Sequence, residues 1–85
     1  MLPYCVYVLQ SLHDEHFYIG FTTDLVARLK KHEDGLVPAT APRRPLSLIY
    51  CEYHRSKADA LRRESYFKTS VGKKALKLML RNQLT

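Results

Sequence analysis

Residues 16–25 read His-Phe-Tyr-Ile-Gly-Phe-Thr-Thr-Asp-Leu, and this stretch passes from a strand pattern directly into a helix start. Its first part is rich in aromatic and β-branched side chains, which favour a β-strand over residues 16–22. Thr23 or Asp24 then offers a side-chain oxygen to the free N–H groups at the start of a helix. We therefore predict a strand that ends at a helix cap, followed by a helix to about His32.

The segments on either side extend this pattern. Before it, Tyr4–Ser11 has the composition of a strand, and residues 12–15 have the length and polarity of a hairpin turn. After it, residues 36–45 contain three prolines and are predicted to form a loop. Leu46–His54 then has the pattern of a third strand, in which successive side chains alternate between the two faces.

The last third of the chain predicts two helices. Ser56 begins a sequence close to a capping box, so a helix should run from there to about Thr69. Gly72 is expected to interrupt the helical pattern, and an amphipathic helix is predicted over Lys73–Gln83. The order β-β-α-β-α-α indicates an α/β fold of the α+β kind, with a three-stranded, mostly antiparallel sheet flanked by three helices.

Length and cysteine content restrict the class of protein. The 85 residues allow one domain, spanning residues 1–85. No apolar run approaches the roughly 18 residues that cross a membrane, and the first residues lack the pattern of a signal peptide. A secreted domain of this size would usually carry more cysteines than Cys5 and Cys51. We expect a cytoplasmic monomer with reduced thiols, and a single disulfide is the alternative.

The charge of the chain is positive and unevenly distributed. The net charge is +6, residues 1–27 contain no Lys or Arg, and residues 28–85 hold all 14. Such asymmetry favours a polyanionic partner, although a short basic domain can also carry this charge for solubility. The residues expected to bind a nucleic-acid backbone, with little base preference, are Arg43, Arg44, Arg62, Arg63, Lys73, Lys74, Lys77 and Arg81.

Two polar side chains of the first predicted helix lie beside its apolar stripe. With 3.6 residues per turn, Arg28 and His32 fall on the same side as Leu25 and Leu29, so both should face the sheet. An arginine and a histidine in this position are candidates for phosphate and proton chemistry. The alternative is an arginine that lies along the edge of the core and a histidine bonded to a carbonyl group.

Glu64 on the second predicted helix also faces inward. A carboxylate in that position is a candidate metal ligand or general base. The alternative is an ordinary helix ion pair, because Glu64 and Lys68 have the favourable i,i+4 order.

Two tyrosines and a glycine stand out in the predicted hairpin. If residues 12–15 form the turn, Tyr7 and Tyr18 become near neighbours across the two strands. Tyrosine rings are common in strands because they pack well, so core packing is the alternative to a catalytic role. Gly20 weakens a strand and indicates that another group approaches closely or that the chain bends.

These residues occur in one order along the chain: Val6-Tyr7, ten intervening residues, Tyr18-Ile19-Gly20, then Arg28, His32 and Glu64. The order resembles the GIY-YIG nuclease superfamily over almost the whole chain. It is most similar to the small stand-alone bacterial members, which resemble the nuclease module of excinuclease C. The stretches Arg43-Arg44-Pro45 and Ala60-Leu61-Arg62-Arg63-Glu64 are also typical of that branch.

The resemblance implies a metal-dependent endonuclease that hydrolyses phosphodiester bonds, in DNA in preference to RNA, with a structure- or damage-related substrate. Residue by residue, the matching catalytic positions are Tyr7, Tyr18, Arg28, His32 and Glu64, and Gly20 is the structural glycine of the motif. The resemblance makes Glu64 the ligand of one Mg²⁺ or Mn²⁺. The first half of the motif departs from the family pattern, because it reads Cys5-Val6-Tyr7 in place of Gly-Ile-Tyr.

Phosphodiester chemistry suggests a role for each of these residues. Arg28 has a fork of donors that suits a phosphate, and Tyr18 would orient water or phosphate. Tyr7 is a poor base unless a neighbouring cation lowers its pKa, so either Tyr7 or His32 activates the water. Two interpretations without catalysis also stay open: a nucleic-acid-binding module that keeps the nuclease fold, and a protein-interaction module of a repair complex.

Overall fold

Three strands lie at the centre of the computed structural model, which describes residues 2–84. A short 3-10 helix, η1, precedes the last strand and lies in the segment predicted to be a loop. The elements in chain order are β1 (Tyr4–Ser11), β2 (Phe17–Thr22), α1 (Leu25–Glu33), η1 (Ala41–Arg43), β3 (Leu46–His54), α2 (Lys57–Phe67) and α3 (Ser70–Met79). The predicted order β-β-α-β-α-α is therefore confirmed.

The sheet has the strand order β2-β1-β3, and β1 pairs with both neighbours in the antiparallel direction. Tyr7 in the middle of β1 lies opposite Gly20 on β2 and opposite Cys51 on β3. Both outer strands are edges of the sheet. The prediction of a mostly antiparallel sheet is confirmed, and every pairing in it is antiparallel.

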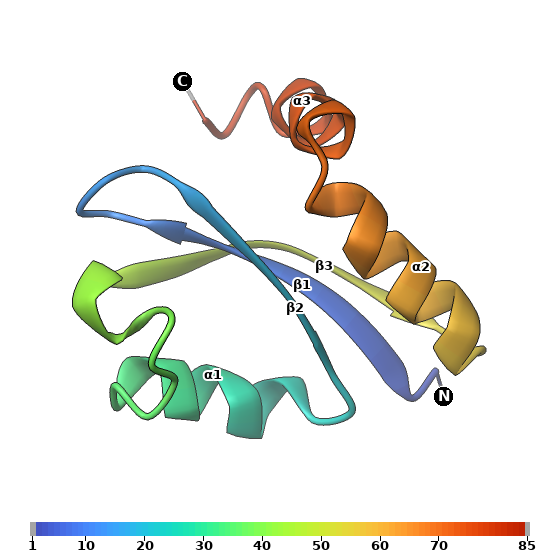
Figure 1. Cartoon of the computed structure of the whole chain (residues 1–85), viewed down its shortest axis with the longest axis horizontal. Coiled ribbons are helices and arrows are strands. Elements are labelled where there is room, and N and C mark those ends of the chain that lie inside the picture. Colours follow the sequence, from blue (N-terminus) through green and yellow to red (C-terminus); the bar gives the residue numbers. More distant parts are fainter. Residues whose placement is uncertain (1, 85) are drawn as a thin grey trace.

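The two faces of the sheet are covered by different helices. Figure 1 shows α1 on one side of the strands and α2 with α3 on the other. Alternation along β1 decides which residues meet which helix. Val6 and Val8 join the core with Phe67 and Leu76, whereas Tyr7 and Leu9 face α1. Tyr7 is therefore buried under α1 and not under the helix that carries Glu64.

Each long helix begins at a residue whose side chain caps it. Asp24 accepts a hydrogen bond from the backbone N–H of Ala27 at 3.1 Å, and Ser56 accepts one from that of Asp59 at 3.4 Å. The capping oxygen satisfies a backbone donor that has no partner within the helix. The predicted caps are confirmed, and Asp24, not Thr23, is the cap of α1.

The predicted boundaries of the last helix are wrong. Thr69 does not end the preceding helix; it caps α3 by accepting a hydrogen bond from the N–H of Gly72 at 3.0 Å. Gly72 therefore lies in the first turn of α3 and does not interrupt it. A Cβ atom at this glycine would lie 2.0 Å from the carbonyl oxygen of Tyr66, so the glycine allows α3 to pack against the end of α2.

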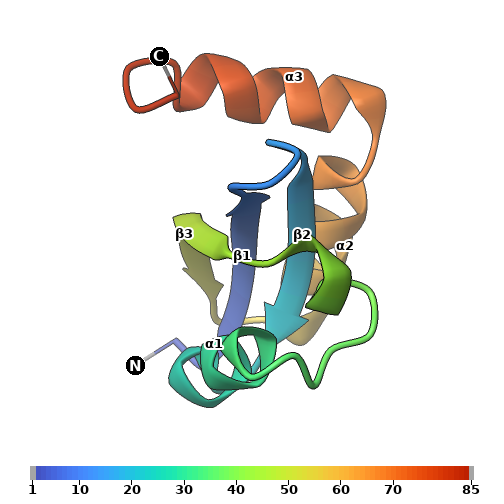
Figure 2. The same ribbon diagram turned by 90° about the vertical axis from the view of Figure 1, so that its left-hand side faces the viewer.

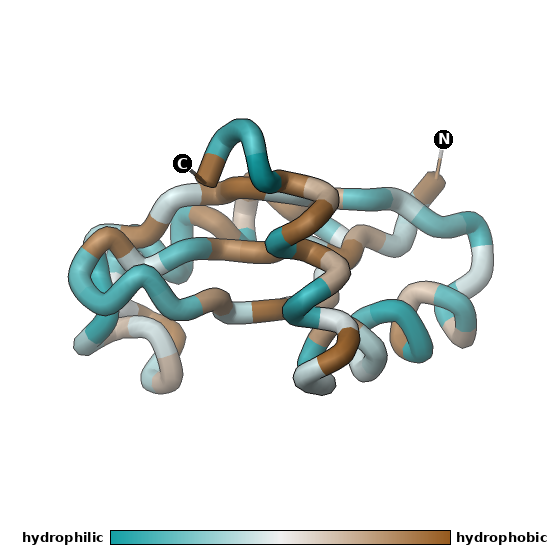
Figure 3. The backbone as a smooth tube through the Cα atoms, turned by 90° about the horizontal axis from the view of Figure 1, so that it is seen from above, coloured by the Kyte–Doolittle hydropathy of each residue, from teal (hydrophilic) through white to brown (hydrophobic). Residues whose placement is uncertain are grey.

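The end of α3 lies earlier than predicted, at Met79 and not at Gln83. The side chain of Gln83 instead donates a hydrogen bond to the carbonyl oxygen of Ile49 at 2.8 Å. Seen from above in Figure 3, apolar residues recur along α3, and Val71, Leu78 and Met79 of this helix remain exposed. Within residues 2–84, the structure contains no helix with the length and hydropathy needed to cross a membrane.

The alternation predicted for the third strand is broken at one point. The pairing of β1 with β3 shifts between Val8 and Leu9, where Val8 lies opposite Tyr50 and Leu9 opposite Leu48. Such a shift turns the following side chains to the other face. Leu48 is therefore on the α1 side and Tyr50 on the α2 side, contrary to the simple alternation of the sequence.

Candidate active site

The ring of Tyr7 lies directly over Gly20. A Cβ atom built on Gly20 would lie 2.3 Å from Cζ and 2.4 Å from the hydroxyl oxygen of Tyr7. Any side chain at this position would displace the phenol, which confirms the prediction that another group approaches closely there. Because β2 is an edge strand, the phenol crosses it toward the side of the sheet.

A chain of hydrogen bonds runs from Tyr7 through His32 to Thr40. The Tyr7 hydroxyl lies 2.7 Å from Nε2 of His32, and Nδ1 of His32 lies 2.7 Å from the hydroxyl of Thr40. The Thr40 hydroxyl donates to the carbonyl oxygen of Val37 at 3.4 Å, so it accepts from His32. His32 therefore carries its proton on Nδ1, and the bare Nε2 accepts the proton of the Tyr7 hydroxyl.

Arg28 reaches the same phenol from one turn earlier on α1. Its Nε donates to the Tyr7 hydroxyl oxygen at 3.4 Å. This hydrogen bond raises the pKa of Arg28 above its ordinary value, and Tyr18 adds a smaller effect in the same direction. The prediction that Arg28 and His32 both face the sheet is confirmed.

Tyr18 completes an aromatic cluster around His32. The centroids of the Tyr7 and Tyr18 rings are 6.4 Å apart, and the Tyr18 and His32 rings meet edge to face at 5.1 Å. The two tyrosines share a face of the sheet but are diagonal neighbours, because Tyr18 pairs with Leu9. The Tyr7 and His32 rings also meet edge to face, at 5.6 Å, so both tyrosine rings pack against the imidazole.

Burial controls the proton affinities of this cluster. It raises the pKa of Tyr7 above its ordinary value, and the opposing effect of the Arg28 hydrogen bond is smaller. The neighbouring cation thus lowers the pKa of Tyr7 as reasoned from the sequence, but not enough to outweigh burial. Burial and the charge of Arg28 lower the pKa of His32. Near neutral pH, the phenol is therefore protonated and the imidazole is neutral.

Glu64 comes from α2, on the other side of the sheet. Its side chain is 19% exposed, and Oε2 lies 3.4 Å from Nζ of Lys68. The negative charge of Glu64 makes the smallest of the contributions to the raised pKa of Tyr7, after burial and the effects of Arg28 and Tyr18. Glu64 thus forms the predicted ion pair with Lys68, and its charge also affects the pKa of Tyr7.

The chemistry of this donor set fits a hard divalent cation. A carboxylate is a ligand of the kind that Mg²⁺ and Mn²⁺ prefer, with water completing the shell. The Lys68 ammonium is a half-exposed partner that a cation can displace from Glu64 at small cost. Within the described residues 2–84, His, Cys, Asp and Glu side chains form no group of three that could hold a metal.

The predicted backbone-binding residues lie in different surroundings. Arg63 is partly buried, with Nε 2.9 Å from Glu52 and its guanidinium 4.2 Å from the centre of the Phe67 ring. Arg62 pairs with Asp59 on the exposed side of α2. Lys74 and Arg81 are exposed on or just after α3, whereas Arg43, Lys73 and Lys77 line one cavity.

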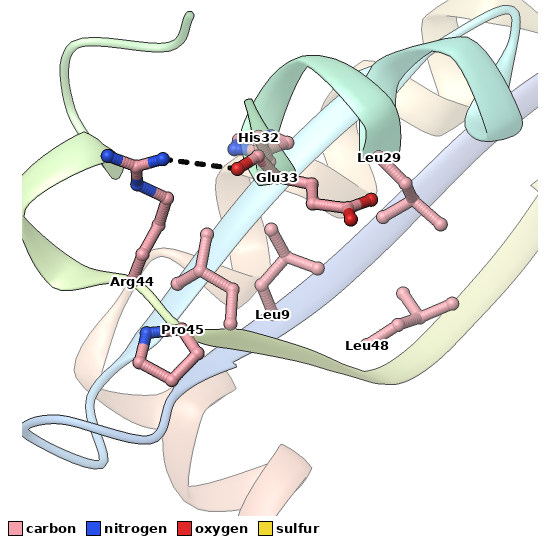
Figure 4. A pocket seen from close by; sticks show the side chains of 8 residues that line it. Leu9, Leu29, His32, Glu33, Arg44, Pro45 and Leu48 are labelled. Atoms are coloured by element: carbon pink, nitrogen blue, oxygen red, sulfur yellow. Dashed lines mark hydrogen bonds between the residues drawn. The ribbon is translucent and has the colours of Figure 1, made fainter. Parts of the chain in front are cut away.

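Arg44 borders a different pocket, of about 490 Å³, behind His32. The walls are largely aliphatic and include Leu9, Leu29 and Leu48 (Figure 4). Arg44 is fixed at the rim, because its Nη1 donates to the carbonyl oxygen of Glu33 at 3.1 Å. The sequence placed Arg44 among residues that bind a backbone, and the structure locates it at the mouth of this apolar pocket.

A comparison with known families identifies the family of this chain. The family model described as "GIY-YIG catalytic domain" matches residues 3–77 of this chain. The chain belongs to the GIY-YIG family. GIY-YIG catalytic domains form a nuclease superfamily whose members act on nucleic acid and generally use a divalent metal. The resemblance inferred from the sequence is therefore confirmed.

Similar proteins are small bacterial ones. The UPF0213 protein of Streptococcus sanguinis strain SK36 is 45% identical over 64 residues, which cover 74% of this chain and 72% of that protein. The UPF0213 protein of Staphylococcus aureus strain Mu3 is 37% identical over 75 residues, with 87% and 90% covered. The solution NMR structure of the UPF0213 protein BH0048 from Bacillus halodurans has a TM-score of 0.58 at 33% identity, with 89% and 83% covered.

Thr40 is a residue of the candidate site that the sequence did not indicate. It is fully buried and bonded to His32, yet it lies in the loop after α1. No helical or strand spacing connects it to His32. The conformation of the loop alone decides which hydroxyl reaches Nδ1, so the residue could be found only in three dimensions.

Proposed function

We propose that this GIY-YIG protein is an endonuclease that hydrolyses phosphodiester bonds in DNA with one divalent cation, Mg²⁺ or Mn²⁺. The observation that carries the proposal is the environment of one oxygen atom. The Tyr7 hydroxyl is bonded at once to His32, which can accept a proton, and to Arg28, which can hold a phosphate. Proton transfer and charge stabilisation, the two needs of phosphodiester hydrolysis, therefore meet at the same point.

His32 and Tyr7 act as one base in this mechanism. Tyr7 alone is weakly basic near neutral pH, because burial keeps its pKa high. His32 is neutral, because burial lowers its pKa, and its Nε2 takes the phenolic proton. The phenolate oxygen then takes a proton from the water that attacks the phosphorus. In this proposal Tyr7 and His32 share the role of base, which the sequence left open between them.

The other site residues orient the imidazole and the water, and they stabilise the charge of the phosphate. Arg28 binds the non-bridging phosphate oxygens with its fixed fork of donors. Thr40 positions His32 by holding the Nδ1 proton, and Tyr18 orients the imidazole and the incoming water. A divalent cation bound by Glu64 would supply positive charge for the phosphate and the leaving oxygen.

Nicking of supercoiled plasmid DNA in the presence of Mg²⁺ or Mn²⁺ tests this function. We expect the parent protein to nick the plasmid and EDTA to stop the reaction. Glu64→Gln keeps the size of the side chain but removes its charge, and we expect the rate to fall by at least about 100-fold. Asp59→Asn is the matched control, because it removes an exposed carboxylate from the same helix.

Two results would contradict the proposal. Equal nicking by the parent and by Glu64→Gln would mean that the activity comes from a contaminating nuclease. Binding of DNA by the parent without any nicking, over a range of plasmid, cruciform and damaged substrates, would favour the non-catalytic nucleic-acid-binding module instead.

A further inference from the structure

A second cavity lies at the hairpin end of the sheet. It has a volume of about 400 Å³ and is formed by the β1–β2 turn, η1 and α3. Figure 2 shows α3 passing across this end of the strands, with the loop that contains η1 beside β2. We call this cavity the hairpin cleft; its lining residues are Glu15, His16, Phe17, Arg43, Lys73 and Lys77.

The hairpin cleft carries an excess of positive charge. Lys73 and Lys77 are exposed, one helical turn apart on α3, and neither forms an ion pair with another residue of the range 2–84. Arg43 is a third cation, and Glu15 is the one acid in the lining. Asp14 holds Nε of Arg43 at 3.4 Å from outside this set. Two lysines are thus left without a partner beside an oriented arginine.

Arg43 supplies a second observation that points to a ligand. Its Nη2 is buried and has no hydrogen-bond partner among the described residues. The residue is firmly placed, because its carbonyl oxygen accepts a hydrogen bond of 2.7 Å from the buried Ser11 hydroxyl. A buried donor without a partner is rare in a native fold, and a bound water or ion is a common acceptor for it. An anion is the acceptor that two neighbouring lysines would favour.

The position of the hairpin cleft relates it to the candidate active site. Phe17 borders the cleft, and Gly20, under the Tyr7 phenol, follows three positions later on the same edge strand. Three residues of a strand span about 10 Å. Successive phosphates of one stacked DNA strand rise by about 3.4 Å along the helix axis and also rotate about it, so this separation places the two sites within a few nucleotides of one strand.

We propose that the hairpin cleft binds a backbone phosphate of the nucleic acid, within a few nucleotides of the phosphate held at Tyr7 and Arg28. This inference rests on the proposed function and adds to it the direction in which the strand leaves the site, along β2 toward the hairpin. Of the eight basic residues selected from the sequence, it assigns Arg43, Lys73 and Lys77 to one contact.

Binding of a short fluorescein-labelled DNA duplex, followed by anisotropy in EDTA over a range of salt concentrations, tests the cleft without cleavage. For Lys73→Gln/Lys77→Gln we expect about tenfold weaker binding and a salt slope reduced by about 0.9, the value for one lost phosphate contact. The control is Arg55→Gln/Lys57→Gln. It removes the same charge from exposed positions beside His54, which pairs with Tyr4 at the opposite end of the sheet.

The outcomes separate this inference from the proposed function. A greater loss of binding in the Lys73/Lys77 variant than in the control supports the cleft, even if the parent does not nick plasmid. Equal losses in both variants overturn it, even if the parent nicks well. Polyglutamate serves as an acidic-protein probe in the same assay. If the Lys73/Lys77 variant binds polyglutamate more weakly but binds DNA as well as the parent does, the inference is also overturned. Thermal unfolding of each variant should match the parent, because all four side chains are exposed.

Discussion

The Tyr7 hydroxyl oxygen lies 2.7 Å from Nε2 of His32, deep under α1, where both residues are almost fully buried. This contact joins a central strand to a helix that begins after the next strand. Because the Tyr7 oxygen also accepts from Arg28, the phenol is the point at which the candidate site comes together.

Tyr7→Phe should therefore abolish most of the activity while preserving the fold. The ring still fills the space over Gly20, but the proton relay loses its middle member. We expect the plasmid-nicking rate to fall by two or more orders of magnitude, the scale of lost acid–base catalysis. Tyr4→Phe removes a phenol from the same strand and should nick at the parent rate. Similar rates for Tyr7→Phe and the parent would exclude the phenol from the chemistry.

Gly20→Ala should act through Tyr7. The new methyl group would lie 2.3 Å from Cζ of Tyr7, so the ring must move away from His32. We expect an overpacking cost of about 1–3 kcal/mol in the free energy of unfolding, together with a large loss of nicking. The double variant Gly20→Ala/Tyr7→Phe should nick no more slowly than Tyr7→Phe alone. Additive losses would show that Gly20 has a separate role.

Thr40→Val removes the acceptor for the Nδ1 proton of His32 without changing the size of the side chain. The buried N–H is left unpaired, so we expect a loss of about 1–3 kcal/mol in the free energy of unfolding. The imidazole should then populate both tautomers, which ¹⁵N NMR of the ring nitrogens will reveal. Thr40→Ser should restore the Nδ1–H tautomer and the nicking rate. An unchanged tautomer in Thr40→Val would show that the aromatic cluster alone orients His32.

The lowered pKa of His32 predicts the acid limb of the pH–rate profile. Burial holds this pKa below the ordinary value of about 6.5, so the imidazole stays able to accept a proton into mildly acidic solution. Nicking should fall only as the pH drops through that lowered pKa. The free energy of unfolding should also fall as the pH drops, because the unfolded chain binds the proton at a higher pH than the folded protein does. The contribution of neutral His32 to stability is fully present above about pH 6.5 and declines below that pH. A limb centred above 6.5 would contradict this assignment.

Glu52 should stabilise the opposite side of the sheet in a more acidic pH window. Burial by itself raises the pKa of Glu52, but hydrogen bonds from His54, Tyr50 and Arg63 outweigh burial and lower it. The stabilisation is present above the pKa of an unfolded glutamate, about 4.3, and is lost as the pH falls through the lower folded value. Urea unfolding of the parent and Glu52→Gln should differ by about 1–3 kcal/mol at neutral pH and converge in acid.

Local sequence patterns were sufficient for the ranges of the strands, for the first two helices and for the caps of those two helices. Alternating strand residues, the Asp24 and Ser56 caps and the hairpin turn act over a few residues, so their consequences can be calculated from the chain alone. The same locality placed Arg28 and His32 on the inner side of α1. It failed at Gly72, because a glycine that lowers helix propensity was needed there for the close packing of α3 on α2.

The sequence by itself determined the fold class, the family and the residue types of the site, since these follow from periodicity and from the order of the motif. Only the tertiary structure decided that Thr40 fixes the tautomer of His32, that the charge of Glu64 acts on Tyr7 from the other side of the sheet, and that Arg43 meets Lys73 and Lys77. The reason is physical. Hydrogen bonds and charges act over a few ångströms in space, and loop conformation and helix packing set those distances independently of separation along the chain.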